Sequence, residues 1–320
     1  MSGAKRSDEP FTYHAGIYLR GVAMGVAELI PGVSGGTIAF ITGIYEHLLD
    51  SLSRIDAPAF RLLWRSGFRA FSKHIDLPFL LVLLAGMVTS VFLLAGLLRE
   101  LLKSYPVLVW SFFFGLILAS AVFVGRRVDR WNLDTIAAAL MGILLGGLAT
   151  QVVPIELEPG PFTIFAAGAV AICAWLLPGV SGSFVLLLLG MYGPVVTAIA
   201  ERNLGFLALM AGGCIVGLGL FARVLAWALR SFPGVTLATL TGFMLGAVAK
   251  LWPWQKTLTY YLDSAGEAVP VHAVPVTPLH FRELTGEEPM VLAALMSMLV
   301  GMVLVILMDW LGSRREAVKR

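Results

Sequence analysis

Two serine- and glycine-rich turns with the same sequence interrupt apolar segments of this chain. Residues 31–35 read PGVSG, and the same five residues return at 178–182, 147 positions later. A Gly–x–Tyr triplet follows each copy at equal spacing, at residues 43–45 and 190–192. Lipid tolerates such breaks only where protein or a water-filled cavity shields the backbone. Two breaks in matching halves are typical of the substrate sites of transporters.

Each turn contains residues that end one helix and allow a new chain direction. Pro31 and Pro178 lack a backbone N–H and clash with the preceding turn, so they stop the first apolar arm. Gly32 and Gly179 permit turn conformations and a close approach of a ligand to the backbone. We therefore expect a helical arm, a tight turn and a second arm at each copy.

The residues after each proline are suited to bind an anion. Ser34 and Ser181 are good N-caps for the second arm, whose first turn presents unpaired N–H groups and a partial positive charge. Phosphate or carboxylate fits such a site. The candidate binding residues are Ser34, Gly35, Gly36, Thr37, Ser181, Gly182 and Ser183. Two alternatives stay open: a cation held by carbonyls on the C-terminal side of each break, and a turn that only lets the arms pack.

One acidic residue lies inside an apolar arm. Glu28 comes three residues before Pro31, and its counterpart in the second copy is Trp175, so only one half carries the charge. A carboxylate at membrane depth is a functional candidate by default, and this position suggests a role in proton coupling. The alternative is a structural carboxylate paired with a neighbouring hydroxyl or arginine. The cysteines and histidines show no metal-ligand spacing, so we expect neither a metal nor a cofactor.

The composition places these turns in a polytopic membrane protein. The 320 residues are 58% hydrophobic and 13% charged, with a mean hydropathy of +0.86, whereas a soluble domain carries about 25% charged residues. Six segments are long enough to span the bilayer, which takes about 20 apolar residues. They are residues 79–98, 106–124, 133–153, 205–226, 234–250 and 290–311. The small net charge of +3 gives no reason to expect a nucleic-acid partner.

The repeat extends beyond the turns and predicts an all-α fold with two homologous halves. Gly86 and Gly115 recur as Gly213 and Gly242, 127 positions later. Each half is expected to form a re-entrant helical hairpin followed by three spanning helices. The first repeat is residues 15–153, with a hairpin at 15–50 and an amphipathic insert at 51–78. The second repeat is residues 154–320, with a hairpin at 162–200 and an external loop at 252–289.

The distribution of basic residues favours re-entrant hairpins over broken helices that cross. With re-entrant hairpins and a cytoplasmic N-terminus, 17 of the 23 Lys and Arg residues face the cytoplasm; with crossing motifs, only 11 do. Cytoplasmic loops are enriched in Lys and Arg. We therefore expect residues 1–14 to be a cytoplasmic tail and both termini to be cytoplasmic. A hairpin plus three crossings is an odd number, so the second half is inverted relative to the first, as in many alternating-access transporters.

The insert at residues 51–78 mixes aromatic and basic side chains. Phe60 and Trp64 lie among Arg61, Arg65 and Arg69. Aromatic and apolar residues opposite basic ones suit a helix that lies on an anionic leaflet. The alternative is a helix packed on the protein's own cytoplasmic face.

The paired motifs resemble those of a known family. PGVSGGT at residues 31–37 and PGVSGS at residues 178–183, each followed by Gly–x–Tyr, are similar to those of the bacterial and archaeal polyprenyl-phosphate (undecaprenyl-phosphate) transporters, and the resemblance covers almost the whole chain. It implies a flippase in the bacterial cytoplasmic (inner) membrane that returns the lipid carrier phosphate for reuse in peptidoglycan and other envelope glycans. The halves differ at Gly36/Ser183 and Thr37/Phe184, so the two tips need not bind equally.

A polyprenyl-phosphate flippase is therefore the leading hypothesis, with either a proton or a sodium ion as the coupling ion. The long tail requires a cleft open to lipid beside the tips. A secondary transporter or channel for a small water-soluble anion is the alternative. A membrane enzyme acting on lipid phosphates ranks last, because the spans lack a nucleophile–base pair or metal cluster. The double substitution Ser34→Ala/Ser181→Ala is expected to weaken transport without unfolding the protein.

Overall fold

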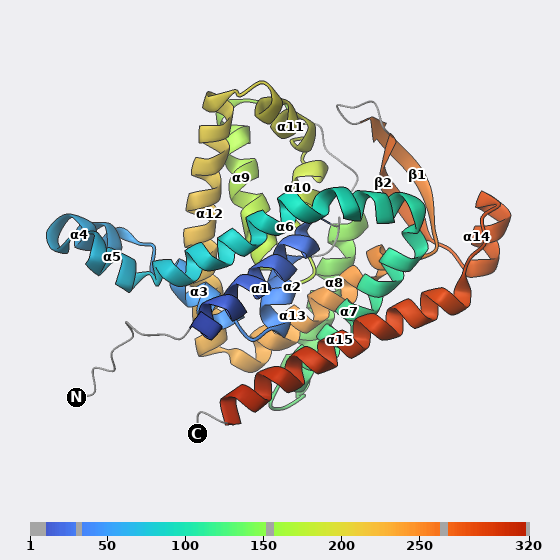
Figure 1. The fold of residues 1–320 in the computed structure, drawn as a ribbon, viewed down its shortest axis with the longest axis horizontal. Coiled ribbons are helices and arrows are strands. Elements are labelled where there is room, and N and C mark those ends of the chain that lie inside the picture. Colours follow the sequence, from blue (N-terminus) through green and yellow to red (C-terminus); the bar gives the residue numbers. More distant parts are fainter. Residues whose placement is uncertain (1–10, 30–33, 152–156, 263–267, 318–320) are drawn as a thin grey trace.

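The computed structural model describes residues 11–29, 34–151, 157–262 and 268–317, and this part of the chain is mostly helical (Figure 1). Within these residues, five helices contain segments long and apolar enough to cross a membrane. They are α6 (Leu77–Ser104), α7 (Pro106–Arg126), α12 (Leu204–Ser231), α13 (Pro233–Ala247, continued by the short helix η1, Val248–Leu251) and α15 (Val291–Ala317). The sixth expected span, 133–153, is the shorter apolar helix α8 (Leu133–Gln151). The prediction of a polytopic membrane protein is confirmed.

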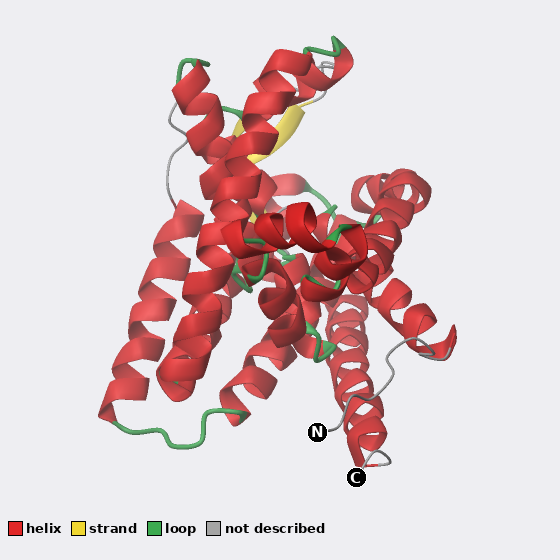
Figure 2. Cartoon of the chain, turned by 90° about the vertical axis from the view of Figure 1, so that its left-hand side faces the viewer, coloured by secondary structure: helices red, strands yellow, loops and turns green. Residues whose placement is uncertain are grey.

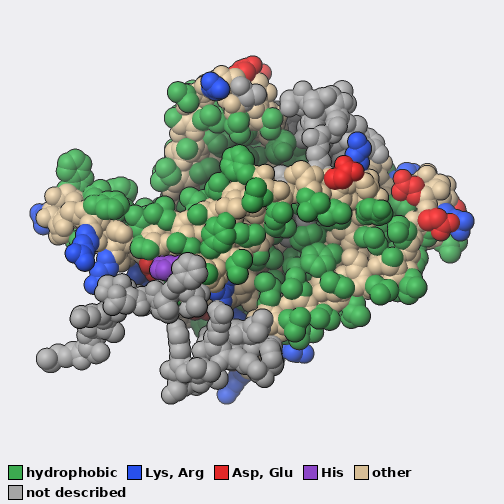
Figure 3. All heavy atoms as spheres, viewed as in Figure 1, with side chains coloured by type: hydrophobic (Ala, Val, Ile, Leu, Met, Phe, Trp, Pro, Cys, Tyr) green, Lys and Arg blue, Asp and Glu red, His purple; other side chains and the backbone are tan. Residues whose placement is uncertain are grey.

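The surface of the body is largely apolar, as lipid contact requires. Hydrophobic side chains cover most of the face seen in Figure 3, with charged ones towards its edges. On α6 alone, Leu84, Phe92 and Leu93 are 54%, 82% and 72% exposed. Exposed apolar area on this scale marks a membrane or protein interface rather than a surface in water.

Each repeated motif forms three helices instead of the two expected arms. The first motif gives α1 (Phe11–Glu28), α2 (Gly35–Ile41) and α3 (Tyr45–Ser53). The second gives α9 (Pro161–Leu176), α10 (Gly182–Leu188) and α11 (Tyr192–Ala200). The extra break falls at the glycine of Gly–x–Tyr, because Gly43 (φ 72°) and Gly190 (φ 67°) adopt the left-handed conformation that ends a helix. Across this break α10 and α11 are bent by 109°.

Four helix pairs pack with their backbones in close contact: α1 with α6, α9 with α12, α7 with α15, and α8 with α13. At each crossing a glycine lies so close to the partner helix that a Cβ would overlap a carbonyl oxygen there. Small residues allow this approach of helices in lipid. The contacts come in matched pairs: Gly21–Leu83 with Gly168–Met210, Gly86–Tyr18 with Gly213–Phe165, Gly115–Met298 with Gly242–Ala139, and Gly301–Phe112 with Gly142–Thr239.

The segment expected as an external loop, residues 252–289, contains ordered secondary structure. Strands β1 (Gln255–Leu262) and β2 (Ala268–Pro275) pair in an antiparallel sheet and are followed by α14 (Pro278–Thr285). The sequence QKTLTYYL of β1 is rich in β-branched and aromatic residues, which favour strands. Figure 2 places these strands at the end of the molecule opposite the chain termini. The all-α expectation therefore holds for the apolar body but not for this segment.

The insert of the first half forms two short helices, α4 (Ala57–Ser66) and α5 (Phe68–His74). They project from the body beside the start of α6 (Figure 1). Gly67 joins them with a left-handed φ of 82°. The insert is thus a helical hairpin and not the single helix expected.

Candidate functional site

The described residues of the two PGVSG motifs meet in the interior of the protein. Ser34 Oγ donates a hydrogen bond to the Trp175 carbonyl oxygen (3.2 Å), and the Gly179 N–H donates to Thr37 Oγ1 (3.0 Å). Ser34 and Thr37 are fully buried. Gly179 has a φ of 91°, which a residue with a Cβ rarely adopts. The fold thus brings together two motifs that lie far apart in the sequence, while the predicted helix breakers Pro31 and Gly32 lie outside the described residues.

In the first motif, side chains of the protein itself accept hydrogen bonds from the N–H groups at the start of α2. Ser34 caps α2 as the sequence predicts, because its Oγ accepts from the Gly36 N–H (3.1 Å). The Gly35 N–H donates to Glu28 Oε1 (2.5 Å). The Trp175 side chain lies beside this carboxyl group, so the two residues at equivalent positions of the repeat meet each other. A carboxylate of the protein itself therefore occupies the place where the sequence predicted a bound anion.

The second turn is arranged differently. Ser181 occupies the N-cap position of α10, but its Oγ lies 2.8 Å from Ser183 Oγ instead of capping the helix. Gly182 and Pro178 are buried, whereas Ser183 is partly exposed and lines a cavity. Of the predicted binding residues, Ser183 is therefore the one that faces open space in this conformation.

The cavity has a volume of about 610 Å³ and lies between the two turns and the β1–β2 segment. Its wall combines polar and apolar side chains. Polar lining residues include Glu28, Ser183, Tyr192 and Lys250, and apolar lining residues include Leu29, Leu102, Val107, Trp110 and Leu187. This size is typical of ligand sites. The cavity thus presents both charged or polar groups and hydrocarbon side chains to a ligand.

Lys250 is a site residue that sequence reasoning missed. It lies in η1, and its Nζ is 4.8 Å from the centre of the Phe184 ring. It also lines a narrow crevice beside Gly179 and Ser181. A lysine at the end of an apolar span is ordinarily read as an interfacial residue, so no signal in the sequence marked it. Only the packing of η1 beside the second turn brings its charge there.

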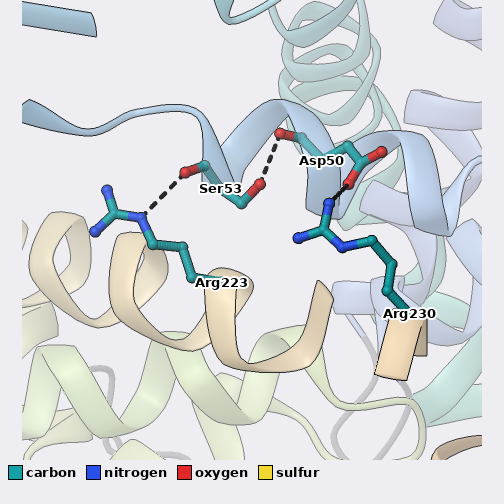
Figure 4. A network of polar contacts seen from close by, with 4 residues as sticks. All are labelled: Asp50, Ser53, Arg223 and Arg230. Carbon is teal, nitrogen blue, oxygen red and sulfur yellow. Dashed lines mark hydrogen bonds and ion pairs between the residues drawn. The ribbon is translucent and has the colours of Figure 1, made fainter. Parts of the chain in front are cut away.

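Helix α3 of the first half packs against α12 of the second half through polar contacts (Figure 4). Arg223 on α12 donates to the carbonyl oxygens of Ser53 (3.1 Å) and Ile55 (2.7 Å) at the end of α3. Arg230 pairs with Asp50 at 3.4 Å. In the described part of the chain, the equivalent helices α11 and α6 make no comparable contact. The two halves are therefore packed asymmetrically.

Together these features define a polytopic membrane protein whose two broken-helix turns meet at a central cavity. The undecaprenyl phosphate translocase-like family matches residues 24–269, and the chain belongs to this family. The family resemblance carried by the two motifs is thereby confirmed.

Two relatives align over most of the chain. A Vibrio cholerae protein described as a polyprenyl-phosphate transporter is 43% identical over 290 residues, which are 90% of this chain and 94% of the relative. A Staphylococcus aureus protein with the same description is 29% identical over 255 residues, 73% of this chain and 85% of the relative. No solved structure matches the chain significantly.

Proposed function

We propose that this protein is a transporter, a flippase, that moves polyprenyl phosphate, such as undecaprenyl phosphate, across the bacterial cytoplasmic membrane for reuse of the lipid carrier. Membership of the family and the names of the two relatives support this substrate. The observation that carries the proposal is the cavity, which joins a lysine and hydroxyl groups at the break to a wall of apolar side chains. A phosphate with a long hydrocarbon tail needs both environments.

We place the headgroup at the second turn in this conformation. Lys250 supplies a point charge suited to phosphate, and Ser183 supplies a hydroxyl donor in the same cavity. Ser181 and Gly182 lie at the start of α10, next to this position. Pro178 and Gly179 prevent α9 from continuing into α10 as one helix. In the alternate conformation the first turn would take over, through Ser34, Gly35, Gly36 and Thr37, with Pro31 and Gly32 as its helix breakers.

We infer that the halves form an inverted repeat of re-entrant hairpins. The matched glycine contacts support the repeat, since equivalent glycines touch equivalent carbonyls in both halves. The odd number of elements per half supports the inversion. Both termini are then cytoplasmic, and the β1–β2 segment and the cavity face outward. The asymmetric packing supports alternating access, with α3 closed on α12 here and α11 closed on α6 in the other state.

Glu28 provides a route to proton coupling. Its carboxyl group lines the cavity that we assign to the phosphate. Two negative groups in one poorly hydrated site repel each other, so binding of one anion favours protonation of the other. When the phosphate enters, Glu28 takes up a proton from solution and releases the Gly35 N–H, to which it is bonded in this conformation.

The test is translocation of polyprenyl phosphate in liposomes reconstituted with the purified full-length chain. Movement is followed by the phosphate that an external phosphatase releases over time. Wild type should expose the inner-leaflet lipid, and Ser183→Ala should slow this without loss of folded protein. Ser183→Ala is cleaner than Ser34→Ala/Ser181→Ala, because buried Ser34 holds two hydrogen bonds whose loss also costs stability. Absence of wild-type movement, with and without a pH gradient, would refute the proposal and direct attention to small anions.

A further inference from the structure

The α4–α5 hairpin lacks a core of its own. Ala59 is the one buried residue of α4, and α5 has none. The contacts between the two helices include the aromatic pairs Phe60–Phe71 and Phe68–Phe71, with ring centres 6.1 and 6.4 Å apart. Helices this short are marginal in water without a surface to pack on. The hairpin therefore leaves most of its apolar surface available for a further contact.

One side of this hairpin is aromatic and exposed. Trp64 is 87% exposed, Phe68 is 65% exposed and Phe60 is 49% exposed. Hydrophobic side chains gather over the upper side of the hairpin in Figure 3, and Lys and Arg side chains lie along its lower side. This separation is that of an amphipathic segment lying in a membrane interface.

The charge of the hairpin is strongly positive, because its acidic neighbours are already engaged. Four basic side chains are exposed: Arg61, Arg65, Arg69 and Lys73. The Asp56 carboxylate accepts from the Ala59 N–H at 2.8 Å and caps α4. The Asp76 carboxylate lies 2.8 Å from His47 Nε2. The basic side chains thus complement an external negative surface.

The base of the hairpin fixes its depth at the start of a membrane span. Buried Ile75 and the His47–Asp76 contact tie the end of α5 to the body. The apolar window of α6 begins directly afterwards, at Leu77. The exposed side chains of Trp64 and Phe68 therefore belong to a hairpin that is anchored next to the start of an apolar span.

We propose that α4 and α5 bind anionic lipids of the adjacent leaflet, with Phe60, Trp64 and Phe68 inserted between the headgroups. The basic side chains contact lipid phosphates from the aqueous side. This surface is separate from the transport cavity. A second protein bound to the same surface is the competing outcome.

An environment-sensitive fluorophore distinguishes these occupants. Trp64→Cys is introduced into the full chain carrying Cys173→Ser and Cys214→Ser and is labelled with the fluorophore. The matched control is Ser66→Cys in the same background, because residues 64 and 66 point to roughly opposite sides of α4. The labelled protein is reconstituted into vesicles of phosphatidylcholine alone or with phosphatidylglycerol. We expect the label at 64, but not at 66, to shift to the blue and to be quenched by doxyl lipids, more strongly in anionic vesicles.

Charge dependence provides the second measurement. Replacing all four basic residues with Gln should abolish the preference for phosphatidylglycerol while the protein keeps its elution volume and its transport activity in phosphatidylcholine vesicles. Raising the salt to about 1 M should act in the same direction, since it shortens the Debye length to about 3 Å. A label at 64 that stays water-like, or is buried but insensitive to doxyl lipids, overturns the proposal.

Discussion

At the residue scale, opposite charges face one cavity from two different halves. Lys250 belongs to the second half and Glu28 to the first, and both line the space beside Ser183. Glu28 bonds the Gly35 N–H, while Lys250 lies over the Phe184 ring. Neither charge has an equivalent in the other half. The two halves therefore differ at the site in the charges that they contribute as well as in their backbone conformation.

Replacing Lys250 with Met should reduce polyprenyl-phosphate transport about 10- to 100-fold. The reason is the loss of one charged hydrogen bond to the phosphate, which is worth about 1.5–3 kcal/mol. Initial rates in the liposome assay measure the effect. Lys256→Met removes an exposed charge from the neighbouring strand and should leave the rate unchanged. Equal rates for the two variants would remove Lys250 from the headgroup site.

Replacing Glu28 with Gln should uncouple transport from the proton gradient. Gln retains an oxygen that accepts from the Gly35 N–H, but it cannot exchange a proton in the cavity. We expect rates with and without an imposed pH gradient to become equal in the variant, while wild type responds to the gradient. If the variant still responds by the same factor, the coupling group lies elsewhere.

At the element scale, α3 contacts α12, whereas the equivalent helix α11 makes no comparable contact with α6 in the described residues. In the proposed transport cycle, the α3–α12 contact would break and an α11–α6 contact would form. The α3–α12 contact is fastened at Ser53 and Ile55 by Arg223 and at Asp50 by Arg230. Each of these bonds joins the hairpin of one half to a span of the other. Opening this side requires that all of them break.

A covalent link between α3 and α12 should therefore stop transport. We would introduce Asp50→Cys and Arg230→Cys in a background with both native cysteines changed to Ser, and bridge them with a bifunctional thiol reagent. The linked protein should lose nearly all translocation, while either single-cysteine variant treated with the same reagent keeps it. Undiminished transport by the linked protein would show that α3 and α12 do not separate.

The glycine crossings make a prediction about stability. A Cβ at Gly213 would overlap the Phe165 carbonyl oxygen, whereas a Cβ at Gly212 would lie 3.5 Å from the Phe165 ring, an ordinary contact. Gly213→Ala should destabilise the protein by about 1–3 kcal/mol through overpacking. Gly212→Ala should be neutral or slightly stabilising, because Ala favours a helix. Melting temperatures of the two purified variants give the comparison, and equal values would contradict the close approach of α9 and α12.

At the scale of the whole molecule, the proposed topology sets which surfaces face each compartment. Arg130→Cys and Leu279→Cys, in the background without native cysteines, each place one exposed thiol outside the spans. A membrane-impermeant thiol reagent added to intact cells should label position 279, and position 130 only after permeabilisation. Labelling of both positions from one side would refute the inverted arrangement.

The apolar spans and the paired turns could be predicted from the sequence because their signals are local. Hydropathy over about 20 residues defines a span, and a proline followed by glycines breaks a helix wherever it lies. The second break at Gly43 and Gly190 was missed, since a glycine inside an apolar segment is equally common at a helix crossing. The sequence predicts only an external loop at residues 252–289, because each strand of the β1–β2 sheet is eight residues long and lies in a segment rich in proline and charge.

The class of protein, the repeat and the two turns follow from the sequence alone, since they depend on residue types and on spacing along the chain. Three features arise only in the folded molecule: Ser34 and Thr37 are buried against the second turn, Glu28 bonds an N–H at the start of α2, and Lys250 lines the cavity. These features depend on contacts between segments far apart in the chain and on the unequal packing of the two halves, in which α3 contacts α12 but α11 makes no comparable contact with α6 in the described residues. Two similar sequence segments are compatible with either packing, so the repeat alone does not specify which one forms.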